Sequence, residues 1–150
     1  DDGNSWSDAM MIAPPIGLIG TGFPVVTAGS EGRVAFGYVG DIGNQTWHGY
    51  MTILTDAFSD NPLFTTVQVN QPDDPIDSSN AYPEGCGYER CGGLGDFLDM
   101  AIDQYGRPWF SLANNDQGEI GIFATITEGP SLRGDLTELS PMPLGGTLSL

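Results

Sequence analysis

The sequence predicts an all-β fold in which four-stranded antiparallel sheets repeat along the chain. Its 150 residues hold 22 Gly and 11 Pro, a composition that interrupts long helices and favours short strands joined by turns. One pattern of apolar and turn residues also occurs twice, in 23–40 and in 97–114. No segment shows convincing helical periodicity.

The repeat is seen when FPVVTAGSEGRVAFGYVG (23–40) is aligned without gaps to FLDMAIDQYGRPWFSLAN (97–114). The two segments share the opening Phe, a central Gly-Arg pair and a later Phe, at an offset of 74 residues. Further along, HGYMTILTD (48–56) aligns with IGIFATITE (120–128) at an offset of 72. Two matches in the same order indicate one repeated unit of four strands.

In the first unit we expect strands over 23–28, 33–38, 47–58 and 63–69. A Ser-Glu-Gly turn joins the first two strands, and its Gly allows the positive φ of a tight hairpin. Ser-Asp-Asn-Pro at 59–62 turns the chain before the last strand.

The second unit repeats this order, with strands expected over 97–102, 108–112, 119–127 and, more weakly, 136–139. Gln-Tyr-Gly forms its first turn. Residues 140–150 are expected to be a tail or a closing segment.

One such sheet cannot bury both of its faces alone. Repeated four-stranded sheets stack radially into β-propellers of about four to eight blades. We therefore predict a partial β-propeller with blades at 23–69 and 97–139. Its open faces would be covered by further blades of the same or another chain, or by copies of itself in a homo-oligomer. Another all-β sandwich with similar hairpins is the alternative.

The N-terminal residues read D-x-G-x-S-W, with Asp1, Gly3, Ser5 and Trp6 at the defined positions. This motif resembles the Asp box of sialidase-like bacterial-neuraminidase-repeat (BNR) propellers. The resemblance implies a hairpin in which Asp1 accepts backbone N–H groups, Gly3 is left-handed, Ser5 adds a hydroxyl contact and Trp6 is buried between sheets. Residues 1–13 would then be the box hairpin and last strand of a preceding blade.

Twenty acidic residues face four basic ones, giving a formal net charge of −16. Such a surface repels nucleic acid and anionic membranes, but it attracts cations or simply favours solubility outside the cell. No apolar run approaches the ~20 residues of a membrane-spanning helix. The sequence opens without a signal peptide, and we expect a processed or excised part of a longer chain.

Cys86 and Cys91 are spaced to close a small disulfide loop. Two sulfurs form a poor metal site, and the one His lies far away in the sequence, so a disulfide is favoured over zinc. Asn44 begins an N-x-T glycosylation sequon. Both features favour an extracellular or cell-surface protein.

The connection 70–96 is 27 residues long, far longer than the usual ~4–6, and such loops are often functional. Propeller topology places it at one end with the loops 14–22, 40–46 and 114–118. This end is acidic, with Asp41, Asp73, Asp74, Asp77, Glu84, Glu89, Asp96 and Asp116. Of these, Asp73, Asp74, Asp77 and Asp96 are candidate Ca²⁺ ligands, because Ca²⁺ takes six to eight oxygens. A solvated acidic surface is the competing interpretation.

Sialidases of this architecture bind the substrate carboxylate with three Arg and use a Tyr nucleophile with a Glu partner. Here Arg33 and Arg107 occupy equivalent positions after turns, which favours a structural role, and Arg133 lies in a Gly-rich turn. Tyr88, Glu89 and Arg90, inside the Cys loop, are the remaining catalytic candidates. A disulfide-pinned surface loop is their competing interpretation. His48 is assigned no catalytic role.

The sequence thus favours a non-catalytic scaffold or binding segment of an extracellular sialidase-like propeller. Its acidic loops would recognise glycan or protein, with Ca²⁺ as a candidate cofactor. A fragment of a sialidase-like glycoside hydrolase and a structural subunit of a surface layer or filament are the alternatives.

Overall fold

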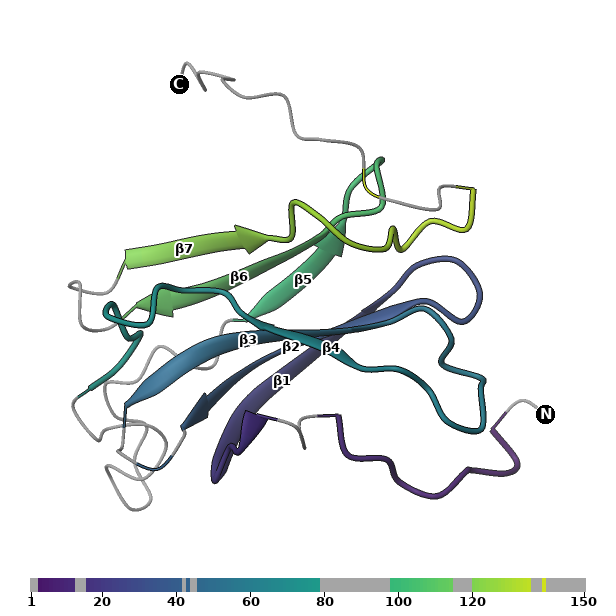
Figure 1. Ribbon diagram of the computed structural model, residues 1–150, viewed down its shortest axis with the longest axis horizontal. Coiled ribbons are helices and arrows are strands. Elements are labelled where there is room, and N and C mark those ends of the chain that lie inside the picture. The colour runs from purple at the N-terminus through teal and green to yellow at the C-terminus, as the bar shows by residue number, and fades with distance from the viewer. Residues whose placement is uncertain are drawn as a thin grey trace.

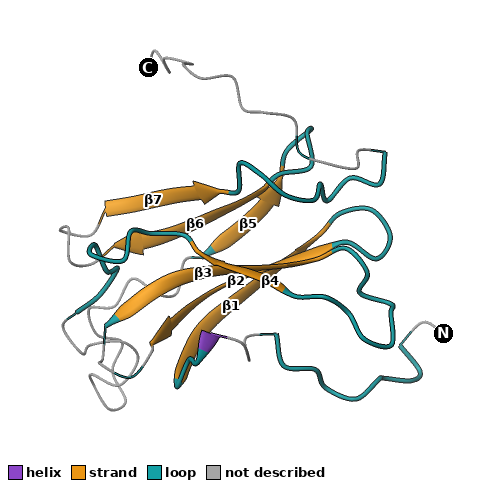
Figure 2. Cartoon of the chain, in the orientation of Figure 1, coloured by secondary structure: helices purple, strands orange, loops and turns teal. Residues whose placement is uncertain are grey.

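The computed structural model describes residues 3–12, 16–41, 43, 46–78, 98–114, 120–135 and 139. Within them the chain forms seven β-strands in two antiparallel sheets, which lie one above the other (Figure 1). Loops join the strands, apart from a short helical turn at Ile16 (Figure 2). The prediction of an all-β fold is confirmed.

The first sheet, called sheet A, has the order β1-β2-β3-β4. Its strands are β1 (Gly20–Ala28), β2 (Val34–Asp41), β3 (Trp47–Leu54) and β4 (Thr65–Gln68). The expected strands 47–58 and 63–69 are thus shorter than predicted. β1 begins earlier than predicted, since a β-bulge between Gly22 and Val25 lets Gly20–Gly22 pair with Val39–Asp41. Phe23, inside the bulge, has a φ of 49° and packs against the core.

The second sheet, called sheet B, has the order β5-β6-β7. Its strands are β5 (Asp99–Ile102), β6 (Pro108–Asn114) and β7 (Ile120–Thr125). The expected fourth strand, 136–139, falls mostly outside the described residues, as does the tail 140–150. Sheet B is therefore described with three strands.

The strand pairing repeats with the offsets found in the sequence. Ala28 pairs with Val34 across the first turn, and Ile102 pairs with Pro108 across the second, so both partners shift by 74 residues. At the next pair of strands, Phe36 opposes Thr52 and Phe110 opposes Ala124. The third strand of the second unit thus lies 72 residues after the third strand of the first unit. Gly32 and Gly106 have positive φ, 73° and 83°, at the equivalent turn positions. The sequence repeat is therefore also a structural repeat.

The two sheets pack through unlike faces. In sheet A the odd-numbered residues from Val25 onward point toward sheet B; we call this side the odd face and the opposite side the even face. A Cβ added to Gly37 would lie 2.7 Å from the Phe110 ring, and one added to Gly49 would lie 2.7 Å from Leu112 Cδ1. Because both repeat offsets are even numbers, Phe110 and Leu112 lie on the even face of sheet B. The odd face of sheet A therefore covers the even face of sheet B.

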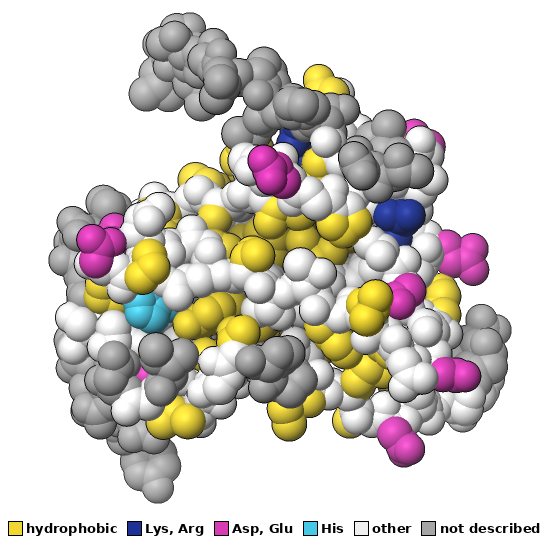
Figure 3. Space-filling model, in the orientation of Figure 1, with side chains coloured by type: hydrophobic (Ala, Val, Ile, Leu, Met, Phe, Trp, Pro, Cys, Tyr) yellow, Lys and Arg dark blue, Asp and Glu magenta, His cyan; other side chains and the backbone are white. Residues whose placement is uncertain are grey.

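The hydrophobic core fills this seam between the sheets. Figure 3 shows hydrophobic side chains, in yellow, gathered across the middle of the visible face. Its buried members are Ala35, Val39, Trp47, Met51, Ile53, Ile76, Met100, Phe110, Leu112 and Leu132. Gly37 and Gly49 act as hollows that admit bulky side chains from sheet B, since no Cβ occupies the space. Close approach of the sheets thus depends on glycine at these two strand positions.

The expected Asp-box hairpin and outer strand of a preceding blade, 1–13, stay a prediction, because no sheet that would pair with them is among the described residues. Ser5–Met11 forms no strand, and Trp6 is 90% exposed instead of being buried between sheets. The physical reason is that no described strand pairs with this segment, so nothing covers the indole ring. Gly3 does adopt the left-handed conformation expected for a turn, with φ of 82°. Asp1 lies outside the described residues.

Candidate functional site

The two ends of the sheets differ in construction. Asp41, Trp47, Asn114 and Ile120, where β2 and β6 end and β3 and β7 begin, lie at one end, which we call the loop end (left in Figure 1). The turns 29–33 and 103–107 lie at the other, which we call the turn end. The candidate ligand-binding residues described by the structure gather at the loop end.

The loop end is organised by the side chain of Asn70, just beyond β4. Its Oδ1 accepts a hydrogen bond from Gly49 N at 2.9 Å, and its Nδ2 donates to the Asp74 carbonyl at 2.7 Å. The chain then returns to β3, where Trp47 N donates to Asp77 O and Ile76 N donates to Trp47 O. The hydrogen bonds of Asn70 thereby hold residues 70–75, an irregular segment that we call the excursion, beside strand β3.

His48 is the buried centre of this polar cluster. Its Nδ1 lies 2.9 Å from Asn70 Nδ2 and 3.1 Å from Gln68 Nε2. The Asn70 amide is oriented by Gly49, and the Gln68 amide donates to Asn70 O at 3.0 Å, so both NH₂ groups face the ring. His48 Nδ1 must therefore accept, which places the proton of the neutral ring on Nε2.

The electrostatics agree with a neutral imidazole. Burial lowers the pKa of His48 from its usual 6.5, and the nearby Asp41 carboxylate opposes this shift only in part. Burial likewise raises the pKa of Tyr50, with smaller contributions from Tyr38 and Asp41. The expectation that His48 plays a structural part agrees with this arrangement.

Three of the four predicted Ca²⁺ ligands are described, and they differ in environment. Asp77 is fully buried, Asp74 is half-buried and Asp73 is exposed. Within the described ranges, no group of three or more His, Cys, Asp or Glu side chains is arranged to hold a metal ion. Asp96 lies outside those ranges. The calcium site therefore stays a prediction that depends on the connection 79–97.

The remaining loop candidates also fall outside the described residues. They are Tyr88, Glu89 and Arg90, the disulfide partners Cys86 and Cys91, the glycosylation acceptor Asn44, and Glu84 and Asp116. Sequence reasoning missed Gln68 and Asn70. The run Asn-Gln-Pro-Asp-Asp, which begins at Asn70 just beyond β4, is a turn signal from which the excursion could have been predicted.

The arginines expected to be structural do hold turns. Arg33 donates from Nη1 to the Ser131 carbonyl. Arg107 is buried, forms an ion pair with Asp103 at 3.5 Å and lies 5.0 Å from the centre of the Tyr105 ring. Burial raises the pKa of Asp103, but hydrogen bonds from Arg107, Trp109 and Tyr105 outweigh burial and leave this pKa below its usual value.

Segment 130–134 joins the two turns at this end. Leu132 accepts from Ser30 N and donates its own N–H to Gly106 O, both at 2.9 Å. Ser131 Oγ donates to the Tyr105 carbonyl at 3.3 Å. All of these hydrogen-bond partners lie in the turns 29–33 and 103–107 or in segment 130–134. The turn end therefore serves structure, and its arginine side chains are engaged there and not at the loop end.

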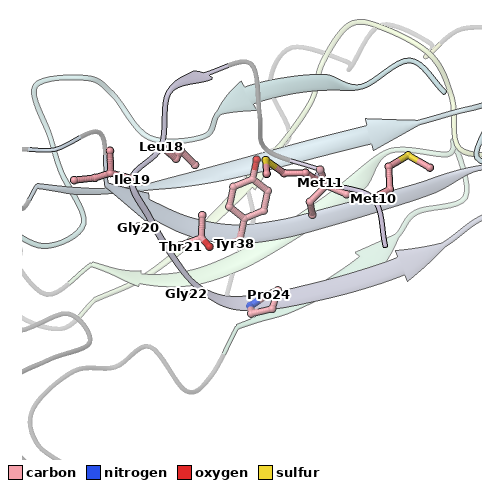
Figure 4. Close-up of a pocket in the computed structure, with 10 residues that line it drawn as sticks. Met10, Met11, Leu18, Ile19, Gly20, Thr21, Gly22, Pro24 and Tyr38 are labelled. Carbon is pink, nitrogen blue, oxygen red and sulfur yellow. The ribbon is translucent and has the colours of Figure 1, made fainter. Parts of the chain in front are cut away.

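A cavity of about 450 Å³ lies on the even face of sheet A, beneath the N-terminal segment (Figure 4). Met10, Met11, Leu18 and Ile19 line it together with Tyr38. Tyr38 Oη lies 2.9 Å from Thr52 Oγ1, which also donates to the Ile12 carbonyl at 3.4 Å. The lining is mostly apolar, which suits a covering side chain better than a charged ligand.

The described residues contain no helix long and apolar enough to cross a membrane. In the comparisons with known proteins, no protein-family model, no curated protein and no solved structure matches the chain.

Proposed function

We propose that this chain is a non-catalytic scaffold and binding segment of an extracellular or cell-surface protein built from stacked four-stranded sheets of the Asp-box propeller type. The observation that supports it is the packing of unlike faces. In a two-fold sandwich, equivalent faces of the two repeats would meet. Here the odd face of one repeat meets the even face of the next, as in sheets stacked in series.

The binding surface in this proposal is the loop end. Asn70 bonds to Gly49 and Asp74 and fixes the excursion 70–75 before a ligand arrives, which lowers the entropic cost of binding. Asp73 and Asp74 give the described part of this end its negative character. A glycan or a protein with cationic groups is the ligand class that this surface suits.

The binding test uses an immobilised panel of sialylated and neutral glycans, with and without Ca²⁺. We expect the chain to retain at least one glycan class, and Asn70→Ala to lose that binding because the excursion is released. Arg133→Ala is the matched control, since Arg133 pairs with Asp135 at the opposite end. Retention of no glycan, or equal loss in both variants, would contradict binding at the loop end.

Turnover of a fluorogenic sialoside separates the proposal from its enzymatic alternative. A non-catalytic segment leaves the substrate intact at high protein concentration. Release of the fluorophore that Tyr88→Phe abolishes would instead establish a sialidase-like hydrolase and overturn the proposal.

A further inference from the structure

The hydrogen bonds among His48, Asn70 and Gln68 form only while the imidazole ring is neutral. His48 Nδ1 accepts from Asn70 Nδ2 at 2.9 Å and from Gln68 Nε2 at 3.1 Å. A protonated imidazole donates from both ring nitrogens and accepts from neither, whichever way the ring is turned. Protonation therefore leaves two NH₂ groups facing a ring that can no longer accept a hydrogen bond.

The two amide side chains differ in how they can respond to a cationic ring. If the Gln68 amide turned over, its oxygen would face the ring, and its bond to Asn70 O at 3.0 Å would be lost. If the Asn70 amide turned over, its NH₂ group would face Gly49 N, which is also a donor. Its oxygen would then face the carbonyls of Gln71 and Asp74, which are acceptors. Gln68 can therefore adapt to the cation, whereas Asn70 has to move away from it.

The charged and titratable groups on the elements that pack around this ring are acidic or neutral. They are Asp41 on β2, Tyr50 on β3, Asp73 and Asp74 in the excursion, and Asp77 beyond it, while β4 and segment 16–22 carry none. The Asp41 carboxylate favours the imidazolium cation, but burial of the ring disfavours it more strongly. The cation is therefore more stable where the segment over the ring has opened and water reaches it.

We propose that His48 is an acid switch of the loop end, which on protonation displaces Asn70 and releases the excursion 70–75 from β3. Opening is local, because the chain beyond the excursion stays attached to β3 through the backbone bonds of Trp47 to Ile76 and Asp77. The switch regulates the surface to which the proposed function assigns ligand binding, and in that respect it rests on the proposed function. A ligand bound there at neutral pH would be released in acid.

Hydrogen exchange of the full chain, followed by NMR without any ligand, tests the switch. The protection factor of the Gly49 amide, which corrects for the intrinsic exchange rate, reports whether Asn70 Oδ1 is in place. Between about pH 7.5 and about pH 5.5 this factor should fall severalfold and at most about tenfold, because one His with the usual pKa of 6.5 gains a proton there in the opened segment. At the lower pH, low concentrations of urea should leave Gly49 exchange unchanged but speed exchange of the β6 amides that pair with β7, which need a larger unfolding.

Two substitutions separate the switch from a general effect of pH. His48→Gln keeps an acceptor oxygen for the two NH₂ groups and does not titrate, so the protection of Gly49 should become independent of pH over this range. Asn70→Asp keeps the acceptor for Gly49 N but presents a carboxylate to the ring, so acid should now strengthen the contact and increase the protection. The direction of the pH dependence is compared, and it does not depend on how stable each variant is.

Three results would overturn the switch. A Gly49 protection factor that changes by less than about twofold between the two pH values shows that the excursion does not respond to the ring. Gly49 exchange that depends on urea as steeply as exchange in β6 shows global unfolding alone. An Asn70→Asp protein that keeps the wild-type direction shows that another group causes the pH dependence. None of these measurements involves a ligand, so a failure to bind glycan would overturn the proposed function and leave the switch standing.

Discussion

Replacing Gly49 and Gly121 by Ala gives the most direct measurement of how the sheets stack. The two glycines occupy the same position of the repeat, one on the third strand of each sheet, β3 and β7. In serial stacking Gly49 lies against a neighbouring sheet and Gly121 does not. The pair therefore compares the same chemical change in a covered and an open environment.

The expected magnitudes follow from the contacts. A Cβ at Gly49 would lie 2.7 Å from both Leu112 Cδ1 and Val69 Cγ2, on two sides at once, so moving one neighbour does not relieve the other. Overpacking of this kind costs about 1–3 kcal/mol. Removing a strand glycine returns about 0.5–1 kcal/mol. We expect Gly49→Ala to lower the free energy of unfolding by about 0–2.5 kcal/mol, and Gly121→Ala to raise it by about 0.5–1 kcal/mol.

Denaturation in guanidinium chloride, followed by tryptophan fluorescence, measures both variants against wild type. Equal m-values would show that the stability changed and not the extent of unfolding. A Gly49→Ala protein as stable as the Gly121→Ala protein would refute the close approach of Leu112 and with it the packing of unlike faces.

Three further perturbations test other parts of the structure. The pKa of His48 is below 6.5 in the folded state, so the folded state binds fewer protons than the unfolded state. Stability should therefore be constant above pH 6.5 and fall below it. Urea melts at pH 5 to 8 should show that His48→Gln flattens this dependence. Thermal denaturation should show that Trp6→Ala changes stability by less than about 0.5 kcal/mol, whereas Trp47→Ala costs about 3–5 kcal/mol. Equal costs would show that the Trp6 side chain is buried. Ser131→Ala should cost about 1–3 kcal/mol, because the buried hydroxyl donates to the Tyr105 carbonyl and accepts from Arg133 N; an unchanged melting temperature would contradict the role of segment 130–134 in joining the turns.

Part of the candidate site was accessible from local sequence signals. Arg33 and Arg107 follow turn glycines at equivalent positions, which predicts the structural contacts that the turns make. The role of Asn70 was not predictable, since it depends on Gly49 lying beside it across β3 and β4. Trp6 was predicted to be buried from its motif alone, but burial requires a covering sheet that no local motif supplies.

The sequence by itself determined the seven described strands, their order and their repeat. Alternating apolar residues and turn glycines are local signals, so Gly32 and Gly106 mark equivalent hairpins without any knowledge of the fold. Only the tertiary structure decided which faces meet. Gly37 and Gly49 become hollows because Phe110 and Leu112 approach them from another sheet, and that approach depends on residues more than sixty positions away in the chain.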